Sequence, residues 1–186
     1  MNIVEDSRQK IGKHDLKGDY FIENGHRVIR SKLPYGDYAL MPERAVDTKK
    51  DIYELAYDID SDHQRFKAEL VGARDAGCKL YILVENTDGV DSLSTLAEWT
   101  EPMYHFEMRK TKSGNAKARR IEGSRLAKAC KTMSERYGAT FLFCTPEHAG
   151  YFIERLLEKG GETNDVRSCT YLCRDGTCGL PSQAKR

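Results

Sequence analysis

The sequence predicts an α/β domain with a mixed central sheet flanked by helices, and two observations carry this prediction. First, residues 80–84 and 140–144 are continuous apolar runs, which are typical of strands covered on both faces of a parallel sheet. Second, each run follows a segment with apolar residues at helical spacing, at 66–77 and 126–137. Helices and strands that alternate in this way favour a layered α/β architecture.

The chain before this alternation is predicted to be mostly extended. A short strand is expected near the N-terminus, and the polar residues 10–20, which include two glycines, are typical of a loop. An Asn-Gly pair is a hairpin turn signal between two apolar segments, so residues 21–30 are predicted to form a hairpin. Residues 35–40 and 45–49 predict two more strands joined by a turn.

Capping residues and apolar spacing predict helices in the rest of the chain. A short helix is expected to begin at residue 51. Four more helices are expected at 62–77, 93–99, 124–138 and 146–160. Asp62 is the expected cap of the second of them. Residues 100–122 are predicted to be irregular. Residues 161–186 are predicted to be a polar, cysteine-containing tail, so the predicted domain covers residues 1–160.

The composition excludes several classes of protein. Of the 186 residues 39% are hydrophobic and 32% are charged, and the mean hydropathy is −0.65, which suits one apolar core and excludes a fibrous protein. No segment approaches the ~18 apolar residues of a membrane helix, and the first residues lack the pattern of a secretory signal. We therefore expect a cytoplasmic protein with no membrane partner, and no motif predicts an organic cofactor.

The six cysteines fall into two groups. Three lie in apolar segments and are expected in the core: Cys78, Cys130 and Cys144. Three lie near the C-terminus: Cys169, Cys173 and Cys178. A zinc site at the second group would need a fourth ligand and usually shows closer pairs, so an unstructured tail is the favoured interpretation and zinc the alternative. Disulfides are not expected in a reducing compartment.

Positive charge is concentrated in one segment. Residues 107–136 contain ten Lys or Arg and three Glu, a net charge of +7, although the whole chain carries only +1. Such a segment can bind a polyanion by releasing its counterions. The alternative for residues 110–120 is a solvated loop without a partner.

Two carboxylates and a lysine lie in the two strands predicted after Pro34. Asp37 and Asp47 are ten residues apart, and Lys49 shares one strand face with Asp47. If the two strands pair, Asp37 comes alongside, and two carboxylates with a strand carbonyl suit Mg²⁺ or Mn²⁺. A lysine beside such a metal can position or deprotonate an attacking water, which suits hydrolysis of a phosphodiester. The alternative is that Asp37 is a turn residue and that the other two form an exposed pair.

Further motifs surround these residues in a fixed order. They are Asp6-Ser7-Arg8-Gln9 on the first strand, Gly36-Asp37-Tyr38, Asp47-Thr48-Lys49, the helix at 63–69 and Glu85 at the end of a strand. In this order they resemble the XPF-type nuclease domain (the excision-repair cross-complementing group-four domain) of the PD-(D/E)xK superfamily. The resemblance covers residues 3–86, and the rest of the chain is similar to short stand-alone bacterial and phage members.

The resemblance implies a restriction-endonuclease-like fold and a divalent-metal-dependent DNA endonuclease of DNA repair or recombination, selective for branched or flapped DNA. It implies that Asp37 and Asp47 bind Mg²⁺ or Mn²⁺ and that Lys49 acts on the attacking water. Three positions depart from the family: Asp47 replaces Glu, Thr48 replaces Arg, and Tyr53 stands where the family has Asp. These departures leave open a catalytically weakened DNA-binding module of the same fold.

Other residues are candidates for the site or for contact with DNA. Asp6 and Arg8 are expected either beside the metal or as a buried ion pair. Gln64 and Arg65 are additional site candidates, and a surface ion pair with a glutamate one turn away is the alternative for Arg65. Six basic residues are expected to contact DNA phosphates: Arg109, Lys110, Lys112, Lys117, Arg119 and Arg120. Members of the family commonly work as dimers through a helix-hairpin-helix domain, which is not evident in this sequence, so a homodimer stays an open alternative.

Overall fold

Six strands form one mixed sheet in the order β2-β1-β3-β4-β5-β6. The structure is a computed structural model that describes residues 1–10, 15–113 and 119–159. The strands are β1 (Asn2–Asp6), β2 (Arg27–Ser31), β3 (Tyr38–Leu40), β4 (Arg44–Lys49), β5 (Lys79–Glu85) and β6 (Thr140–Cys144). The pairs β1–β3 and β3–β4 are antiparallel, whereas β1–β2, β4–β5 and β5–β6 are parallel. The predicted mixed sheet is therefore confirmed.

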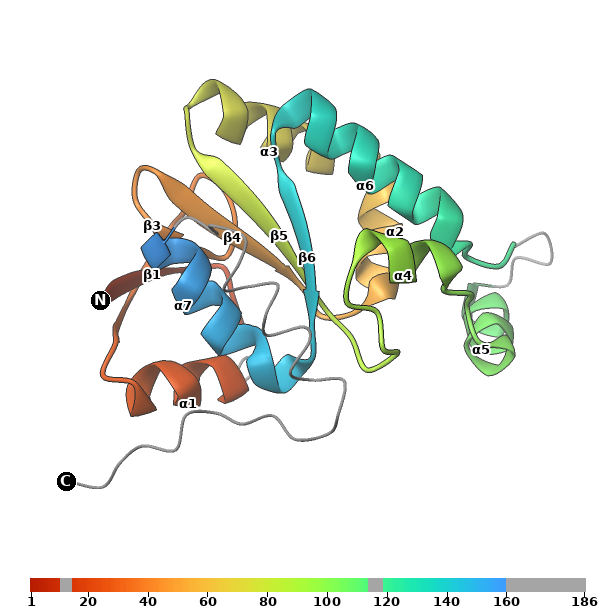
Figure 1. The fold of residues 1–186 in the computed structure, drawn as a ribbon, viewed down its shortest axis with the longest axis horizontal. Coiled ribbons are helices and arrows are strands. Elements are labelled where there is room, and N and C mark those ends of the chain that lie inside the picture. The colour runs from red at the N-terminus through yellow and green to blue at the C-terminus, as the bar shows by residue number, and fades with distance from the viewer. Residues whose placement is uncertain (11–14, 114–118, 160–186) are drawn as a thin grey trace.

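Helices cover both faces of this sheet (Figure 1). Within the described residues they are α1 (Asp15–Glu23), α2 (Ile52–Asp60), α3 (His63–Asp75), α4 (Leu93–Glu98), α5 (Met103–Ser113), α6 (Gly123–Tyr137), the 3-10 turn η1 (Pro146–His148) and α7 (Ala149–Lys159). One core packs α1 and α7 against the sheet around Phe21 and Phe152. The other packs α2, α3, α4 and α6 against the opposite face around Phe66 and Leu126. The sheet is thus the middle layer of three, and its central strands are covered on both sides.

Local signals explain where several elements begin and end. A helix begins at residue 52, next to the predicted start at residue 51, and Asp51 is its cap, because its carboxylate accepts a hydrogen bond from the Glu54 amide at 2.7 Å. Asp62 precedes α3, but its side chain makes no capping bond and instead accepts from Arg65 at 2.5 Å. Gly138 ends α6 with a φ of +72°, a left-handed conformation that favours glycine.

The predicted loop is wrong over residues 15–20, and the predicted hairpin at 21–30 is also wrong. Residues Asp15–Glu23 form α1, and the Asn-Gly pair ends this helix instead of turning a hairpin. The Gly25 amide donates to the carbonyl of Ile22 and the His26 amide to that of Phe21, which is a Schellman C-cap with Gly25 at a φ of +69°. The chain then enters β2, which pairs parallel with β1 because the helix has reversed its direction.

The prediction that residues 100–122 are irregular is also wrong over half of their length. Helix α5 lies at one side of the molecule (Figure 1), and most of its side chains are exposed. Its attachment is electrostatic, because the guanidinium of Arg109 binds both carboxylate oxygens of the fully buried Glu101 at 2.8 and 3.0 Å. Because α5 is attached in this way, its sequence does not show apolar residues repeated at helical spacing, and the helix was not predicted.

Among the described residues, no helix combines the length and the apolar character that crossing a membrane would require. Cys78, Cys130 and Cys144 are buried, as expected. The predicted tail, with Cys169, Cys173 and Cys178, lies outside the described residues.

Candidate active site

The backbone around Gly36 fixes the position of Asp37. Gly36 has a φ of +69°, and a Cβ there would lie 2.9 Å from the carbonyl oxygen of Val46, so the close approach requires glycine. The Asp37 amide donates to that same carbonyl at 2.8 Å, and the Asp37 carbonyl accepts from the Asp6 amide at 2.8 Å. Asp37 is therefore held between the ends of β1 and β4.

Asp47 and Lys49 lie on the face of β4 that α2 and α3 cover, and both are buried. The Lys49 ammonium lies 2.7 Å from Oδ2 of Asp47 and 2.5 Å from Oδ2 of Asp58, which is a buried residue of α2. It also lies 5.0 Å from the centre of the Phe66 ring. The structure thus replaces the exposed pair that the sequence left open with a buried cluster of one ammonium and two carboxylates.

The Asp37 carboxylate is oriented by its neighbours. Its Oδ2 accepts from the amide of Thr48 at 2.8 Å and from the Thr48 hydroxyl at 2.6 Å, and its Oδ1 accepts from the amide group of Gln9. Thr48, which stands where the resemblance expects an arginine, therefore positions a carboxylate of the site. Each carboxylate oxygen can accept more than one bond, so these contacts leave room for a cation.

A cavity of about 440 Å³ opens over these residues. Its lining includes Asp6, Arg8, Gln9, Tyr35, Gly36, Asp37, Asp47, Arg65 and Glu69. Lys49 and Asp58 are absent from this lining and lie beneath Asp47. The structure therefore brings both predicted metal ligands to one cavity and places the predicted lysine behind one of them.

Burial and neighbouring negative charges raise the pKa values of several carboxylates at this cavity. Burial, followed by the charge of Asp37, raises the pKa of Asp47 to about 6, although the ammonium of Lys49 acts in the opposite direction. Burial also raises the pKa of Asp37, and it raises the pKa of Glu69 with a further contribution from Asp47. Burial alone would lower the pKa of Lys49, but Asp47 and Asp58 outweigh it and raise that pKa, so the lysine is cationic at neutral pH.

These properties fit a divalent cation. A raised carboxylate pKa means that negative charge is poorly compensated at the cavity, and a bound cation would compensate it. The Lys49 ammonium lies against Oδ2 of Asp47, a buried oxygen that has no hydrogen-bond partner among the described residues. The described residues contain no cluster of three or more His, Cys, Asp or Glu with metal-binding geometry. Asp37 and Asp47 are the candidate pair because both line the cavity.

The additional candidates separate into two groups. Asp6 and Arg8 line the cavity and also form the ion pair that the sequence left as an alternative, with 2.7 Å between Arg8 Nε and Asp6 Oδ2. Burial would raise the pKa of Asp6, but the hydrogen bonds from Arg8 outweigh it and lower that pKa. Arg65 lines the cavity as well, whereas Gln64 is exposed and lies outside its lining.

Sequence reasoning missed Asp58 and the placement of Glu69. Glu69 reaches the loop before β3, where its Oε1 accepts from the Gly36 amide at 2.9 Å, and Arg65 lies 3.6 Å from its other oxygen. Arg65 also lies 3.2 Å from Oδ1 of Asp58. The one available signal was an aspartate beside the apolar face of the helix that begins at residue 52, where a charge needs a buried partner.

The predicted DNA-binding residues differ in their surroundings. Two of them stabilise the fold, because Arg109 and Arg120 both bind Glu101, the second through the Glu101 carbonyl. Lys110 lies 5.9 Å from the ring of Phe106. Lys112 and Arg119 are exposed, and Lys117 lies outside the described residues.

Two of the solved structures that match the chain come from one protein. XPF from Aeropyrum pernix matches with a TM-score of 0.58 and 18% identity, over 90% of this chain and 69% of that chain. XPF from Aeropyrum pernix in complex with DNA matches with a TM-score of 0.56 and 16% identity, over 86% of this chain and 64% of that chain. No family model matches the chain, and no curated protein matches it. The chain therefore has the XPF-type nuclease fold that its sequence motifs predict.

Proposed function

We propose that this protein is a divalent-metal-dependent endonuclease that hydrolyses phosphodiester bonds of branched or flapped DNA. The observation that carries the proposal is the convergence of Asp37 and Asp47 on one cavity, with Lys49 ion-paired behind Asp47. The XPF-type fold supports it, as does the matching Aeropyrum pernix structure in complex with DNA.

In this proposal, Asp37 and Asp47 hold Mg²⁺ or Mn²⁺. The bound cation supplies Lewis-acid stabilisation of the phosphate and lowers the pKa of the attacking water. Thr48 and Gln9 hold the Asp37 carboxylate in one orientation. Lys49 remains protonated and fixes Asp47, so positioning fits its surroundings better than proton abstraction does.

Two arginines at the cavity suit the phosphates that flank the reacting bond. The Arg8 and Arg65 side chains are 60% and 58% exposed, although each also pairs with a buried carboxylate. An arginine held in this way presents its remaining donors to a phosphate with little loss of side-chain entropy. No described residue of this cavity suggests base recognition, so selection by DNA shape is the form of specificity we propose.

The alternative is a DNA-binding module with weakened catalysis. Tyr53 stands where the resemblance expects an aspartate and does not line the cavity. Asp58 nevertheless supplies a carboxylate to Lys49 from the next turn of the same helix, which favours a working site.

Nicking assays test the proposal. Purified protein is incubated with labelled flap, junction, linear duplex and RNA substrates, with Mg²⁺, Mn²⁺ or EDTA. We expect metal-dependent nicking of branched DNA that Asp37→Asn and Asp47→Asn abolish, while Asp75→Asn, an exposed change at the far end of α3, leaves it intact. Tight binding of branched DNA without nicking in either metal would instead support the binding module.

A further inference from the structure

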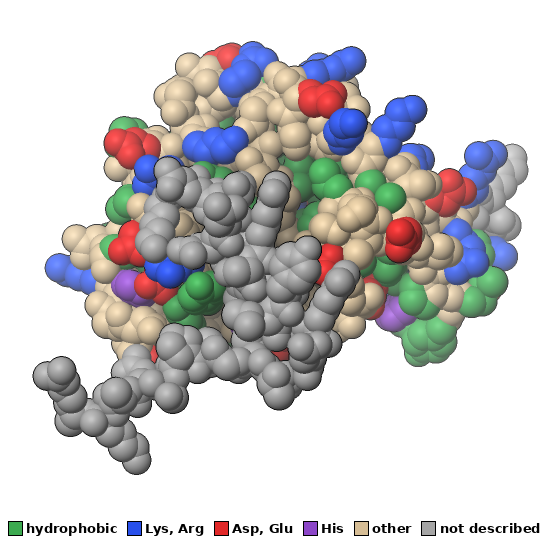
Figure 2. All heavy atoms as spheres, in the orientation of Figure 1, with side chains coloured by type: hydrophobic (Ala, Val, Ile, Leu, Met, Phe, Trp, Pro, Cys, Tyr) green, Lys and Arg blue, Asp and Glu red, His purple; other side chains and the backbone are tan. Residues whose placement is uncertain are grey.

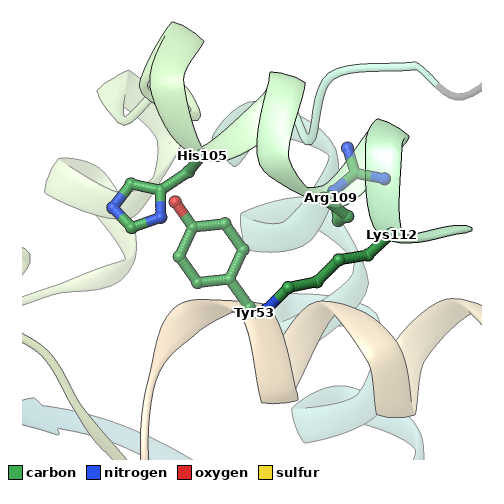
Figure 3. Close-up of a pocket in the computed structure, with 4 residues that line it drawn as sticks. All are labelled: Tyr53, His105, Arg109 and Lys112. Carbon is green, nitrogen blue, oxygen red and sulfur yellow. The ribbon is translucent and has the colours of Figure 1, made fainter.

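A second cavity lies between α2 and α5, apart from the candidate active site. It has a volume of about 430 Å³ and is lined by Tyr53, His105, Arg109 and Lys112. Figure 3 shows the Tyr53 ring on α2 facing α5, with the imidazole of His105 beside it and the Lys112 side chain extending toward it. A neighbouring cavity of about 540 Å³ shares Tyr53 and Arg109 and adds Arg119. The two cavities are neighbours that share these two lining residues, and together they are here called the α2–α5 groove.

The aromatic side chains of this groove differ in exposure: His105 is exposed, whereas Tyr53 is half-buried and its ring also lies 5.9 Å from that of Trp99. The rings of Tyr53 and His105 are 5.3 Å apart, and Tyr104, which is 71% exposed, lies 5.6 Å from His105. The Tyr53 hydroxyl is buried and has no hydrogen-bond partner among the described residues. Figure 2 shows basic, apolar and histidine side chains gathered over α5 at the right of the molecule. Exposed rings beside cations are the combination that binds unpaired bases and their phosphates.

The cations of the groove differ in their function. Arg109 is committed to Glu101, which fixes α5 against the loop before it. Lys112 and Arg119 are exposed and have no ion-pair partner among the described residues, so their charges are available to phosphates. Because Arg109 anchors the helix, the aromatic and basic side chains are held in place before a ligand arrives.

We propose that the α2–α5 groove binds unpaired nucleotides of a single-stranded DNA arm, with bases stacked on Tyr53 and His105 and phosphates bound by Lys112 and Arg119. This inference rests on the proposed endonuclease function and specifies its substrate. Helix α2 separates the groove from the active site: it carries Tyr53 toward the groove and Asp58 toward Lys49. A strand that leaves a branch point at the active site would therefore pass Asp47, Lys49 and α2, which is about 10 Å across, to reach the groove. Duplex DNA cannot use the rings, because its bases are already stacked.

Binding of a labelled 15-nucleotide oligo-dT to the full chain tests this proposal by fluorescence anisotropy in EDTA, where no cleavage occurs. We expect His105→Ala/Lys112→Ala to raise the Kd for oligo-dT about tenfold, which is the typical loss for one stacked base. The slope of log K against log salt should fall by about 0.7, as for one lost phosphate contact on a single strand. Binding of a blunt duplex should change less than twofold.

The matched control is Ile22→Ala/Arg27→Ala, which removes one exposed apolar side chain and one exposed charge near the β2 edge of the sheet. This control should bind oligo-dT as the wild type does. An unchanged Kd in His105→Ala/Lys112→Ala, an equal loss in the control, or an equal loss for blunt duplex would overturn the proposal. Because binding is measured without metal, a wild type that fails to nick DNA would overturn the proposed function and leave this test intact.

Discussion

The ammonium nitrogen of Lys49 lies 2.5 Å from Oδ2 of Asp58, a carboxylate of α2 that lies outside the strand motif. The same nitrogen lies 2.7 Å from Asp47, so two carboxylates compete for one buried cation. Burial of one ammonium with one carboxylate would leave Asp47 neutralised by Lys49. A second carboxylate shares the ammonium and leaves Asp47 with more of its negative charge toward the cavity. Asp58 is therefore a positioning residue for the proposed metal site.

Asp58→Asn tests this relationship. Loss of one partner of a buried ion pair typically costs about 3 kcal/mol of stability, and Lys49 would then pair with Asp47 alone. If the variant folds, we expect kcat for flap DNA to fall at least tenfold while KM stays within a factor of two, because Asp58 does not line the cavity. The pKa of Lys49 should fall, so any alkaline limb of the pH–rate profile should move to lower pH.

The control for this variant is Asp75→Asn, which removes an exposed carboxylate at the C-terminal end of α3, outside the cavity lining. It should leave kcat and the pH profile unchanged. A purely structural function for Asp58 would lower the melting temperature and leave both kinetic observables in place.

The sequence predicted the part of the site that lies within one strand. Asp47 and Lys49 share a face because successive side chains of a strand alternate, and the structure confirms this geometry. Asp58 and Glu69 could not be placed in the same way, because they reach the site only through the docking of α2 and α3 on the sheet. Contacts between elements depend on packing angles that no local pattern encodes.

The two helices that the sequence did not predict, α1 and α5, were missed for a related reason. Helix α1 buries only Lys17 and Phe21 among its described side chains, so it shows no apolar stripe, and its lysine is buried only because it pairs with Glu85 of β5. Helix α5 depends on Glu101 in a similar manner. Parallel strands and the large helices were predictable because their burial is repeated along the sequence. Helix α1 instead depends on one buried aromatic residue, Phe21, and on an ion pair with a distant strand, and α5 depends on an ion pair with a residue eight positions before Arg109.

Proton competition at Asp47 predicts a pH-dependent metal affinity. Burial raises the pKa of Asp47 to about 6, and a metal ligand must be deprotonated, so protons compete with the cation below that pH. We expect the Kd for Mn²⁺ to be about tenfold higher at pH 5 than at pH 7.5, because binding is weaker at the lower pH. Isothermal titration calorimetry of the chain without DNA measures it. Asp47→Asn should bind weakly at both pH values, and an equal wild-type Kd at pH 5 and 7.5 would contradict the assignment of Asp47 as a ligand.

Glu101 should stabilise the α5 region in a pH-dependent way. Burial would raise the pKa of Glu101, but the hydrogen bonds from Arg109 and from the Ile121 amide outweigh it and lower that pKa. A carboxylate with a lowered pKa stabilises the folded state above its unfolded pKa of about 4.5, and this stabilisation is lost as the pH falls through the folded value. Glu101→Gln should therefore lower the melting temperature at pH 7, and the difference from the wild type should shrink below pH 4.5.

The control for Glu101 is Glu98→Gln, an exposed change on the neighbouring α4. It should leave the melting temperature unchanged at both pH values. Because Glu101 anchors Arg109, its glutamine variant should also weaken binding of oligo-dT to the α2–α5 groove. A stability difference that stays constant from pH 7 to pH 3 would show that Glu101 acts through packing instead of charge.

Gly36→Ala should show whether Mn²⁺ binding depends on the position of Asp37, because the variant changes the backbone there and keeps every charge of the site. A Cβ at this position would lie 2.9 Å from the Val46 carbonyl oxygen, and its left-handed φ costs about 1 kcal/mol for a residue other than glycine. The loop must move to relieve the contact, which displaces Asp37 although every charge remains. We expect loss of Mn²⁺ binding together with a loss of stability of about 2 kcal/mol, measured by urea unfolding.

Gly18→Ala is the matched control, because Gly18 lies within α1 with no atom near its Cβ position, and it should raise stability by about 0.5–1 kcal/mol without affecting Mn²⁺ binding. Retention of Mn²⁺ affinity in Gly36→Ala would show that Asp37 is not one of the ligands.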